Sequence, residues 1–255
     1  MIQHRARKHL GQNFLQDQSV IQNILHVFGP KEKDKVIEIG PGLGALTHPL
    51  MNQLGHLTVI EIDRDLQRYW QTQYPHQMDV LCADALTVDF SALGSDLRVI
   101  GNLPYNISTP LLFHLLTYCA CIQDMHFMLQ KEVVDRLCAQ PNTKNYGRLS
   151  IMVQYHCDVE CLFLVAPEAF HPKPKVNSAV VRLTPHTTPC YPMVDKEALK
   201  SLVASAFSMR RKTLANNLKN IISVEELRQL DIDPTQRPEQ IPIEAYVRIV
   251  QSITK

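Results

Sequence analysis

The chain has 255 residues, of which 45% are hydrophobic and 20% charged, and its formal net charge is +1. This length can bury one α/β domain plus a smaller one, and the composition is ordinary for a soluble globular protein. No apolar run approaches the ~20 residues that span a bilayer, and the first residues form no apolar signal segment, so we expect a cytoplasmic protein.

The cysteine and histidine patterns argue against disulfides and metals. Seven cysteines include no Cys-x-x-Cys pair, and eleven histidines include no His-Glu-x-x-His motif. Such patterns favour reduced core thiols. We therefore predict no metal site.

Positive charge is concentrated in two segments. Residues 1–16 carry three basic side chains and no acidic one, and residues 195–220 carry six basic and two acidic side chains. A net charge of +1 argues against a protein that coats nucleic acid over its whole surface. Local basic patches are instead typical of a protein that binds phosphates at chosen places.

The first predicted elements lead to a glycine-rich turn. A helix is expected from Asp17 to Gly29, and a strand over 35–39 then runs into Gly40, Gly42 and Gly44 before a helix over 45–54. Glycines let the backbone approach a ligand, and a helix N-terminus offers free N–H groups to a carboxylate or phosphate. This turn is a candidate cofactor site.

Acidic residues end the next two strands. The strand over 56–60 ends at Glu61, which suits a pair of ribose hydroxyls, and the strand over 79–83 ends at Asp84, which suits an adenine amino group. The glycines and Glu61 also satisfy a dinucleotide fingerprint, but Glu38, the second acid and Pro41 favour S-adenosylmethionine over a nicotinamide cofactor. Either acid could instead be only a helix cap.

The fourth strand ends in Asn102-Leu103-Pro104-Tyr105, a rigid loop at the carboxyl end of the sheet. The Asn102 amide oxygen and the Pro104 carbonyl can accept the two amino hydrogens of a flat base while Tyr105 stacks on its face. The loop would then hold a base that carries an exocyclic amine. By itself, the same loop is also compatible with a simple strand-ending turn.

Two later stretches are cationic. The loop over 141–148 ends at Arg148 and either contacts substrate or is only a solvated connection. The stretch over 170–178 contains Phe170, Lys173 and Lys175; Phe170 is either a core residue or the partner of Tyr105 in an aromatic slot for an extruded base. The expected elements between the loop at Tyr105 and the last strand are helices over 108–118, 131–138 and 149–155 and strands over 124–129, 159–165 and 179–183.

A domain boundary is predicted at residues 185–194, because this segment contains three prolines and shows no periodicity. The predicted domains are therefore 1–184, a linker over 185–194, and a helical domain over 195–255. The helical domain carries Arg210, Arg211 and Lys212 and either binds RNA or only covers the sheet with a solvated charged face.

Five ordered motifs resemble those of the rRNA adenine N6,N6-dimethyltransferases, and most closely those of the bacterial members that act on the small subunit. The motifs are Lys8 with Gly11-Gln12-Asn13-Phe14-Leu15, the run from Glu38 to Gly44, Asn102 to Tyr105, Phe170 to Val176, and Arg210 to Leu218. The resemblance implies an α/β fold: a Rossmann-like class I S-adenosylmethionine-dependent methyltransferase sheet with helices on both faces, plus a small all-helical C-terminal domain. It also implies that residues 1–16 form a basic lid.

The resemblance further implies dimethylation of the N6 amines of two adjacent adenosines near the 3′ end of small-subunit (16S) rRNA, with S-adenosylmethionine converted to S-adenosylhomocysteine. The expected catalytic residues are Asn102, Pro104, Tyr105 and Phe170. The expected cofactor contacts are Asn13, Leu15, Gly40, Gly42, Glu61, Asp84 and Asn102. The expected RNA contacts are Arg5, Arg7, Lys8, Arg148, Lys173, Lys175, Arg210, Arg211 and Lys212.

The expected partner is a late assembly intermediate of the small ribosomal subunit, bound by a monomeric enzyme. Three alternatives remain. The first is the large-subunit rRNA adenine methylases, which share the Asn-x-Pro-Tyr loop. The second is the DNA adenine methylases, but these usually carry a second proline where this chain has Leu103, which counts modestly against them. A ribosome-assembly factor that acts by binding alone would need the basic module but not Asn102.

Overall fold

The computed structural model describes residues 7, 12–209 and 211–254, so the predictions for Arg5, Lys8 and Arg210 lie outside the described residues. The chain divides into two compact units: Met1–Val134 with Asp158–Pro185, and Asp135–Cys157 with His186–Lys255. Each unit is formed by two separate stretches of the chain, and the second unit has one stretch before and one after Pro185. The second unit therefore includes residues 135–157, which the predicted domains assign to the methyltransferase domain.

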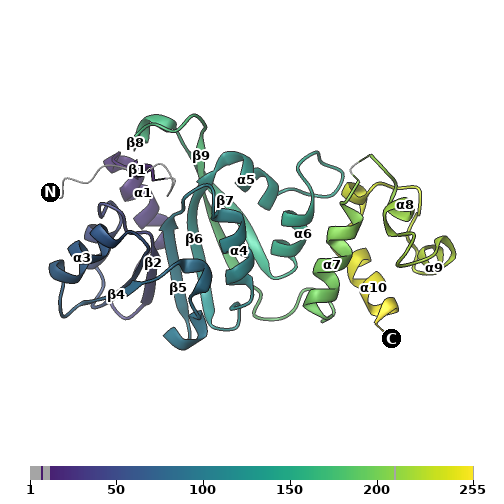
Figure 1. Cartoon of the computed structure of the whole chain (residues 1–255), viewed down its shortest axis with the longest axis horizontal. Coiled ribbons are helices and arrows are strands. Elements are labelled where there is room, and N and C mark those ends of the chain that lie inside the picture. Colours follow the sequence, from purple (N-terminus) through teal and green to yellow (C-terminus); the bar gives the residue numbers. More distant parts are fainter. Residues whose placement is uncertain (1–6, 8–11, 210, 255) are drawn as a thin grey trace. The chain divides into compact units, whose positions relative to one another are not determined.

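The first unit is built on a seven-stranded sheet with the order β4-β3-β2-β5-β6-β9-β7 (Figure 1). Its strands are β2 (Lys35–Ile39), β3 (Leu57–Glu61), β4 (Met78–Cys82), β5 (Leu97–Asn102), β6 (Ile122–Gln130), β7 (Cys157–Val165) and β9 (Ser178–Pro185). The five strands β4, β3, β2, β5 and β6 are parallel to their neighbours, and β9 is antiparallel to β6. This mixed sheet, with helices between its strands, confirms the predicted α/β class.

The strand order changes direction between β2 and β5. The chain leaves β2 outward through β3 and β4 and then returns to pair β5 with the other side of β2. In open α/β sheets, ligands bind outside the carboxyl ends of the strands at such a switch point. Gly40 follows β2 and Asn102 ends β5, so the two sequence motifs meet there.

The helices predicted from Asp17 to Gly29 and over 108–118 lie near their expected limits, whereas a helix over 64–73 was not predicted. The helices of the first unit are α1 (Gln18–Phe28), α2 (Thr47–Met51), α3 (Arg64–Gln73) and α4 (Ser108–Leu116), with short 3-10 turns at Ala85–Thr87, Phe90–Leu93 and Pro167–Ala169. In α1, Asp17 caps the first turn and Gly29 adopts a left-handed conformation at the end. The face with Ile21, Ile24, Leu25 and Phe28 is buried. Helix α2 is shorter than the predicted helix over 45–54, because residues 40–46 form the turn that precedes it.

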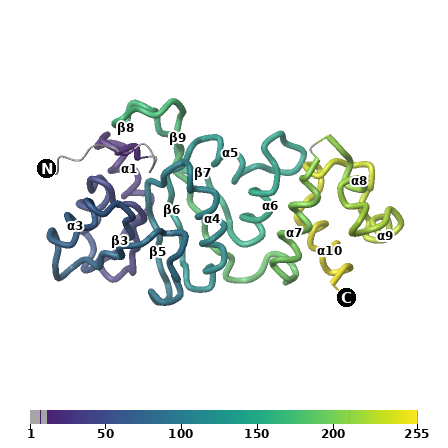
Figure 2. Tube along the Cα trace, viewed as in Figure 1, coloured from purple at the N-terminus to yellow at the C-terminus, as the bar shows by residue number. Residues whose placement is uncertain are grey.

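A two-stranded sheet that the sequence does not predict joins distant parts of the chain. Strand β1 (Phe14–Leu15) pairs antiparallel with β8 (Phe170–His171), with Leu15 opposite Phe170. Figure 2 shows the early purple segment beside the green β8 segment. The N-terminal motif and the Phe170 motif are therefore neighbours in space.

The second unit is helical. It contains α6 (Arg148–Gln154), α7 (Lys196–Ala206), α8 (Leu214–Leu218), α9 (Val224–Gln229), a 3-10 turn at Pro238–Gln240 and α10 (Ile243–Ile253), and α5 (Lys131–Leu137) leads into it. Helix α7 packs against α6, α8 and α10. This packing explains why residues 135–157 belong with the C-terminal helices. Among the described residues, no helix combines the length and apolar composition that a membrane crossing requires.

Candidate active site

A cavity of about 900 Å³, including the open space at its mouth, lies at the switch point of the first unit. Its walls come from the N-terminal segment, the glycine turn, the ends of β3 and β4, and the loop after β5. Ligand sites at this position are typical of enzymes with open α/β sheets. The lining residues are Gln12, Asn13, Phe14, Ile39, Gly40, Gly42, Ile60, Glu61, Ile62, Ala83, Asp84, Ala85, Asn102, Leu103, Pro104, Tyr105, Asn106 and Ile107.

The orientation of the Asn102 carboxamide is set by the N-terminal segment. Its Nδ2 donates a hydrogen bond to the Asn13 carbonyl at 2.9 Å. Because a carbonyl can only accept, the NH2 end of Asn102 must face Asn13 and the oxygen end must face away from it. No described residue donates to Oδ1, so this oxygen is available as an acceptor for a ligand.

The rest of the loop after β5 is held by two further hydrogen bonds. The hydroxyl groups of Tyr105 and Ser178 are 2.7 Å apart, and Ser178 is fully buried. Burial raises the pKa of Tyr105, so its hydroxyl stays neutral and fixes the ring rather than transferring protons. The Pro104 carbonyl accepts the Ile107 N–H at 3.2 Å, which leaves one of its two lone pairs for a ligand.

The glycine turn exposes backbone to the cavity. Gly40 has a φ of +71°, and a Cβ built on it would meet nothing within 4 Å. The open space at this position lets a ligand approach the peptide closely, as expected for a methyl-donor site.

Glu61 also lines the cavity and is almost fully buried. Its Oε1 accepts the Asp63 N–H at 2.8 Å. Burial raises the pKa of Glu61, while hydrogen bonds from the backbone N–H groups of Asp63, Gly42 and Ile62 oppose the rise by stabilising the carboxylate. A carboxylate in this position can bind a pair of hydroxyl groups.

The alternative that the acids at the strand ends are only helix caps is wrong for Glu61 and partly right for Asp84. Asp63, not Glu61, caps α3 by accepting the Asp65 N–H. Asp84 does cap the following 3-10 turn, through the Leu86 N–H at 2.9 Å, and it also lines the cavity. Capping with one oxygen leaves the other oxygen of Asp84 able to accept from a ligand.

The N-terminal segment contributes residues that the sequence reasoning did not assign. Gln12 and Phe14 line the cavity, and a Cβ on Gly42 would lie 3.2 Å from the Phe14 ring. Gln12 Nε2 donates to Asp63 at 3.3 Å. Both residues are next to Asn13 in the first motif. Their place in that motif could therefore have identified them as site residues from the sequence.

Two predicted site residues do not line the cavity. Leu15 and Phe170 are each 5% exposed and belong to the hydrophobic core under the β1–β8 pair. Tyr105 lines the cavity and Phe170 does not, so the predicted aromatic slot between them stays a prediction. Leu15 and Phe170 do not line the cavity because the pairing of β1 with β8 directs both side chains into the core.

The predicted RNA contacts have different surroundings. Arg7 forms ion pairs with Asp63 at 3.0 Å and Asp65 at 2.5 Å, which a contact to phosphate would have to replace. Lys173 is exposed and paired with Glu168. The remaining described residues of this set are exposed: Arg148, Lys175, Arg211 and Lys212.

Metal ligands were not expected. Within residues 7, 12–209 and 211–254, no three His, Cys, Asp or Glu side chains lie close enough together to hold a metal ion.

Comparison with known proteins gives full-length matches. The family model "Ribosomal RNA adenine dimethylase" matches residues 3–255. The chain is 57% identical over 256 residues to a "Ribosomal RNA small subunit methyltransferase A" of Legionella pneumophila, covering 99% of this chain and 100% of the relative. It is 51% identical over 260 residues to the protein of the same name from Pseudomonas aeruginosa, covering 100% and 97%.

Two solved structures share the fold. A dimethyladenosine transferase from Plasmodium falciparum has a TM-score of 0.80 at 24% identity, covering 94% of this chain and 97% of the other. The 23S rRNA methyltransferase ErmE has a TM-score of 0.71 at 24% identity, covering 95% and 100%. At this identity the two structures bear on the fold alone, which is that of S-adenosylmethionine-dependent methyltransferases of class I.

Proposed function

The chain belongs to the ribosomal RNA adenine dimethylase family, and we propose that it dimethylates the N6 amines of two adjacent adenosines near the 3′ end of small-subunit rRNA. The family depends on S-adenosylmethionine as methyl donor. Full-length relatives at 50–57% identity named as small-subunit enzymes favour the small subunit over the large one. The expected partner is a late small-subunit assembly intermediate, bound by a monomer.

The residues around the cavity suit S-adenosylmethionine. Gly40 offers exposed backbone to its amino acid part, with Gly42 beside it in the cavity wall. Glu61 offers a carboxylate to the ribose hydroxyls, and Asp84 offers an acceptor to the adenine amine. When bound, S-adenosylmethionine supplies an electrophilic methyl group on a sulfonium. Asn13 acts through its carbonyl, which orients Asn102.

The orientation of Asn102 is the observation that carries the proposal. Asn102 Oδ1 accepts one N6–H of the target adenine, and a carbonyl of Leu103 or Pro104 accepts the other. Leu103 lines the cavity, and none of the described residues donates to its carbonyl, whereas the Pro104 carbonyl already accepts from Ile107.

These two acceptors draw the amino hydrogens out of the plane of the base, so that the nitrogen lone pair, otherwise delocalised into the ring, turns toward the methyl donor. Tyr105, fixed by Ser178, stacks on the base. The rate then comes from positioning and preorganised electrostatics rather than from a titrating base. Phe170 contributes to this arrangement by supporting β1, which carries the segment that orients Asn102.

The test is to incubate purified protein and labelled methyl donor with under-methylated small and large ribosomal subunits and to map the labelled bases. We expect label on two adjacent adenosines of the small-subunit rRNA and none on the large subunit. Asn102→Ala should abolish transfer while the exposed-site control Asn177→Ala retains it.

Label on the large subunit, or near-normal turnover of Asn102→Ala, would contradict the proposal. If Asn102→Ala restored subunit maturation in cells that lack the protein, a role by binding alone would replace the catalytic one.

A further inference from the structure

Helix α3 packs behind the donor site and reaches it through two side chains. Gln67 Nε2 donates to the Glu61 carbonyl at 2.7 Å, and Trp70 Nε1 donates to the Gly42 carbonyl at 3.1 Å. Gln67 and Trp70 are one turn apart and therefore share a face of α3. Glu61 and Gly42 both line the cavity, but neither Gln67 nor Trp70 does.

Both polar backbone groups of Gly42 have a partner. Its N–H is one of the backbone groups that stabilise the Glu61 carboxylate, and its carbonyl accepts the indole N–H of Trp70. Gly42 therefore connects the Trp70 indole of α3 to the Glu61 carboxylate.

The Trp70 ring also fixes the turn by contact. Trp70 is fully buried, and a Cβ on Gly44 would lie 2.7 Å from its ring. The ring is itself packed among Tyr69, His48 and Tyr74, with the Trp70 and Tyr74 rings stacked at an interplanar angle of 11°. Its position leaves the glycine turn no room to move toward α3.

We propose that Trp70, together with Gln67, is a positioning residue of the methyl-donor site: Trp70 holds the Gly42 carbonyl and Gln67 holds the Glu61 carbonyl, so that turn and carboxylate keep the spacing that the donor requires. The proposal rests on the proposed function only in taking S-adenosylmethionine as the ligand of the cavity. Neither residue is placed to contact the target base. Substituting Trp70 or Gln67 should therefore affect donor binding and not the methyl-transfer step.

The first test measures the Kd of S-adenosylhomocysteine by calorimetry for the full-length wild type and three variants. Trp70→Phe keeps a ring but loses the N–H donor, and Gln67→Met is a milder change because Gln67 is only partly buried. Trp70→Phe should weaken binding by roughly tenfold, the usual effect of leaving a buried hydrogen-bonding group without its partner, and Gln67→Met should weaken binding by a smaller factor. With saturating donor, kcat should stay within about twofold, since uniform binding affects KM rather than kcat.

Tyr74→Phe is the matched control. It removes the hydrogen bond between Tyr74 and His48, 3.0 Å long, from the same aromatic cluster but leaves the bond to Gly42. We expect its Kd to match that of the wild type. Equal Kd values for wild type, Trp70→Phe and Gln67→Met, or an equal loss in Tyr74→Phe, would overturn the proposal.

The second test uses the wild-type protein and so does not depend on the folding of a variant. Trp70 is the one tryptophan of the chain, so protein labelled with ¹⁵N-tryptophan gives a single indole N–H resonance. Saturation with S-adenosylhomocysteine should shift this resonance, because its acceptor Gly42 lines the cavity. An unchanged resonance would overturn the proposal. Because both tests measure donor binding without RNA, they would still succeed if the proposed rRNA target proved wrong.

Discussion

The carboxamide of Asn102 is used at both ends. Its NH2 group is bonded to the Asn13 carbonyl, and its oxygen is left as the acceptor that the proposed reaction needs. A side chain of the same shape that lacks the NH2 group would separate these two functions.

Asn102→Asp makes that separation. A carboxylate cannot donate to the Asn13 carbonyl, and the two oxygens would repel each other, so the side chain should turn away from its present position. We expect the single-turnover rate of methyl transfer to fall by at least ~100-fold, as for the loss of a preorganised polar group in other active sites. Asn177→Asp adds the same charge at an exposed position and should keep the wild-type rate.

Glu38 is a buried acid of the glycine motif. Burial raises its pKa from 4.5 to about 8, with a smaller contribution from the charge of Glu61 and an opposing one from the Thr47 hydroxyl. In the folded protein Glu38 therefore holds its proton at neutral pH.

This raised pKa predicts how stability depends on pH. The folded state binds more protons than the unfolded state between pH 4.5 and about 8, so the contribution of Glu38 is complete below that window and is lost as pH rises through it. In urea titrations from pH 5 to 8, the free energy of unfolding of Glu38→Gln should fall less than that of the wild type. Each unit by which the pKa of Glu38 is raised corresponds to ~1.4 kcal/mol, so the difference between the two proteins can reach several times this value. Parallel stability curves for the two proteins would contradict the raised pKa.

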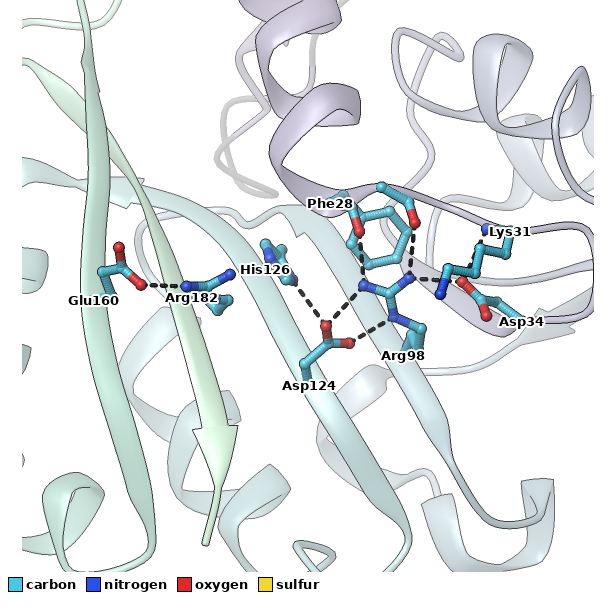
Figure 3. Close-up of polar contacts among 9 residues, drawn as sticks. Phe28, Lys31, Asp34, Arg98, Asp124, His126, Glu160 and Arg182 are labelled. Atoms are coloured by element: carbon cyan, nitrogen blue, oxygen red, sulfur yellow. Dashed lines mark hydrogen bonds and ion pairs between the residues drawn. The ribbon is translucent and has the colours of Figure 1, made fainter.

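At the scale of elements, Arg98 connects α1 to the sheet (Figure 3). From β5 it donates to the carbonyls of Phe28 and Gly29 at the end of α1, at 2.7 and 3.3 Å. It also bonds to Asp124 of β6 and to Asp34, and its guanidinium lies 4.3 Å above the centre of the Phe28 ring. One side chain thus closes the C-terminus of α1, forms ion pairs with two acids and stacks on an aromatic ring.

Arg98→Met should be strongly destabilising. It leaves two acids and two carbonyls of the helix end without their donor, and breaking one side of a buried ion pair typically costs ~3–5 kcal/mol. Urea denaturation measures the change.

Arg182→Met is the control within the same close-up. Its pair with Glu160 is half exposed, and exposed pairs contribute at most ~1 kcal/mol. Equal losses in the two variants would show that burial does not determine the importance of Arg98.

At the scale of the whole molecule, the net charge of +1 conceals where the basic side chains lie. Arg211 and Lys212 are exposed in the helical unit. In the first unit, Arg7 and Lys173 are instead engaged with acidic partners. Contacts to rRNA phosphates are therefore expected from the helical unit and, in the first unit, from the exposed Lys175.

The double variant Arg211→Glu/Lys212→Glu should weaken rRNA binding without changing the Kd of S-adenosylhomocysteine. Each lost phosphate contact should reduce the slope of log Kd against log salt by ~0.7–0.9. Filter binding over a salt series measures it, with Lys33→Glu/Lys35→Glu as a charge-matched control at exposed positions of the first unit. An unchanged slope in the first variant would remove these residues from the interface.

The sequence alone determined those parts of the structure that depend on interactions between residues close together in the chain. The strand and helix periods, the cap at Asp17, the glycine turn and the loop after Asn102 depend on residues close together in the chain, and the structure has them near their predicted positions. Because parallel strands bring their carboxyl ends to one edge, these local features also indicated most of the cavity lining.

Long-range pairing decided the rest. The sequence does not show that β1 pairs with β8, which buries Leu15 and Phe170 instead of exposing them to a ligand. Nor does it show that Arg7 pairs with Asp63, that α6 packs with α7, or that Trp70 of α3 bonds to Gly42. Each of these contacts joins two segments that are far apart in the chain. The local sequence pattern of one segment does not depend on the other, so the sequence does not identify the partner and only the packed structure does.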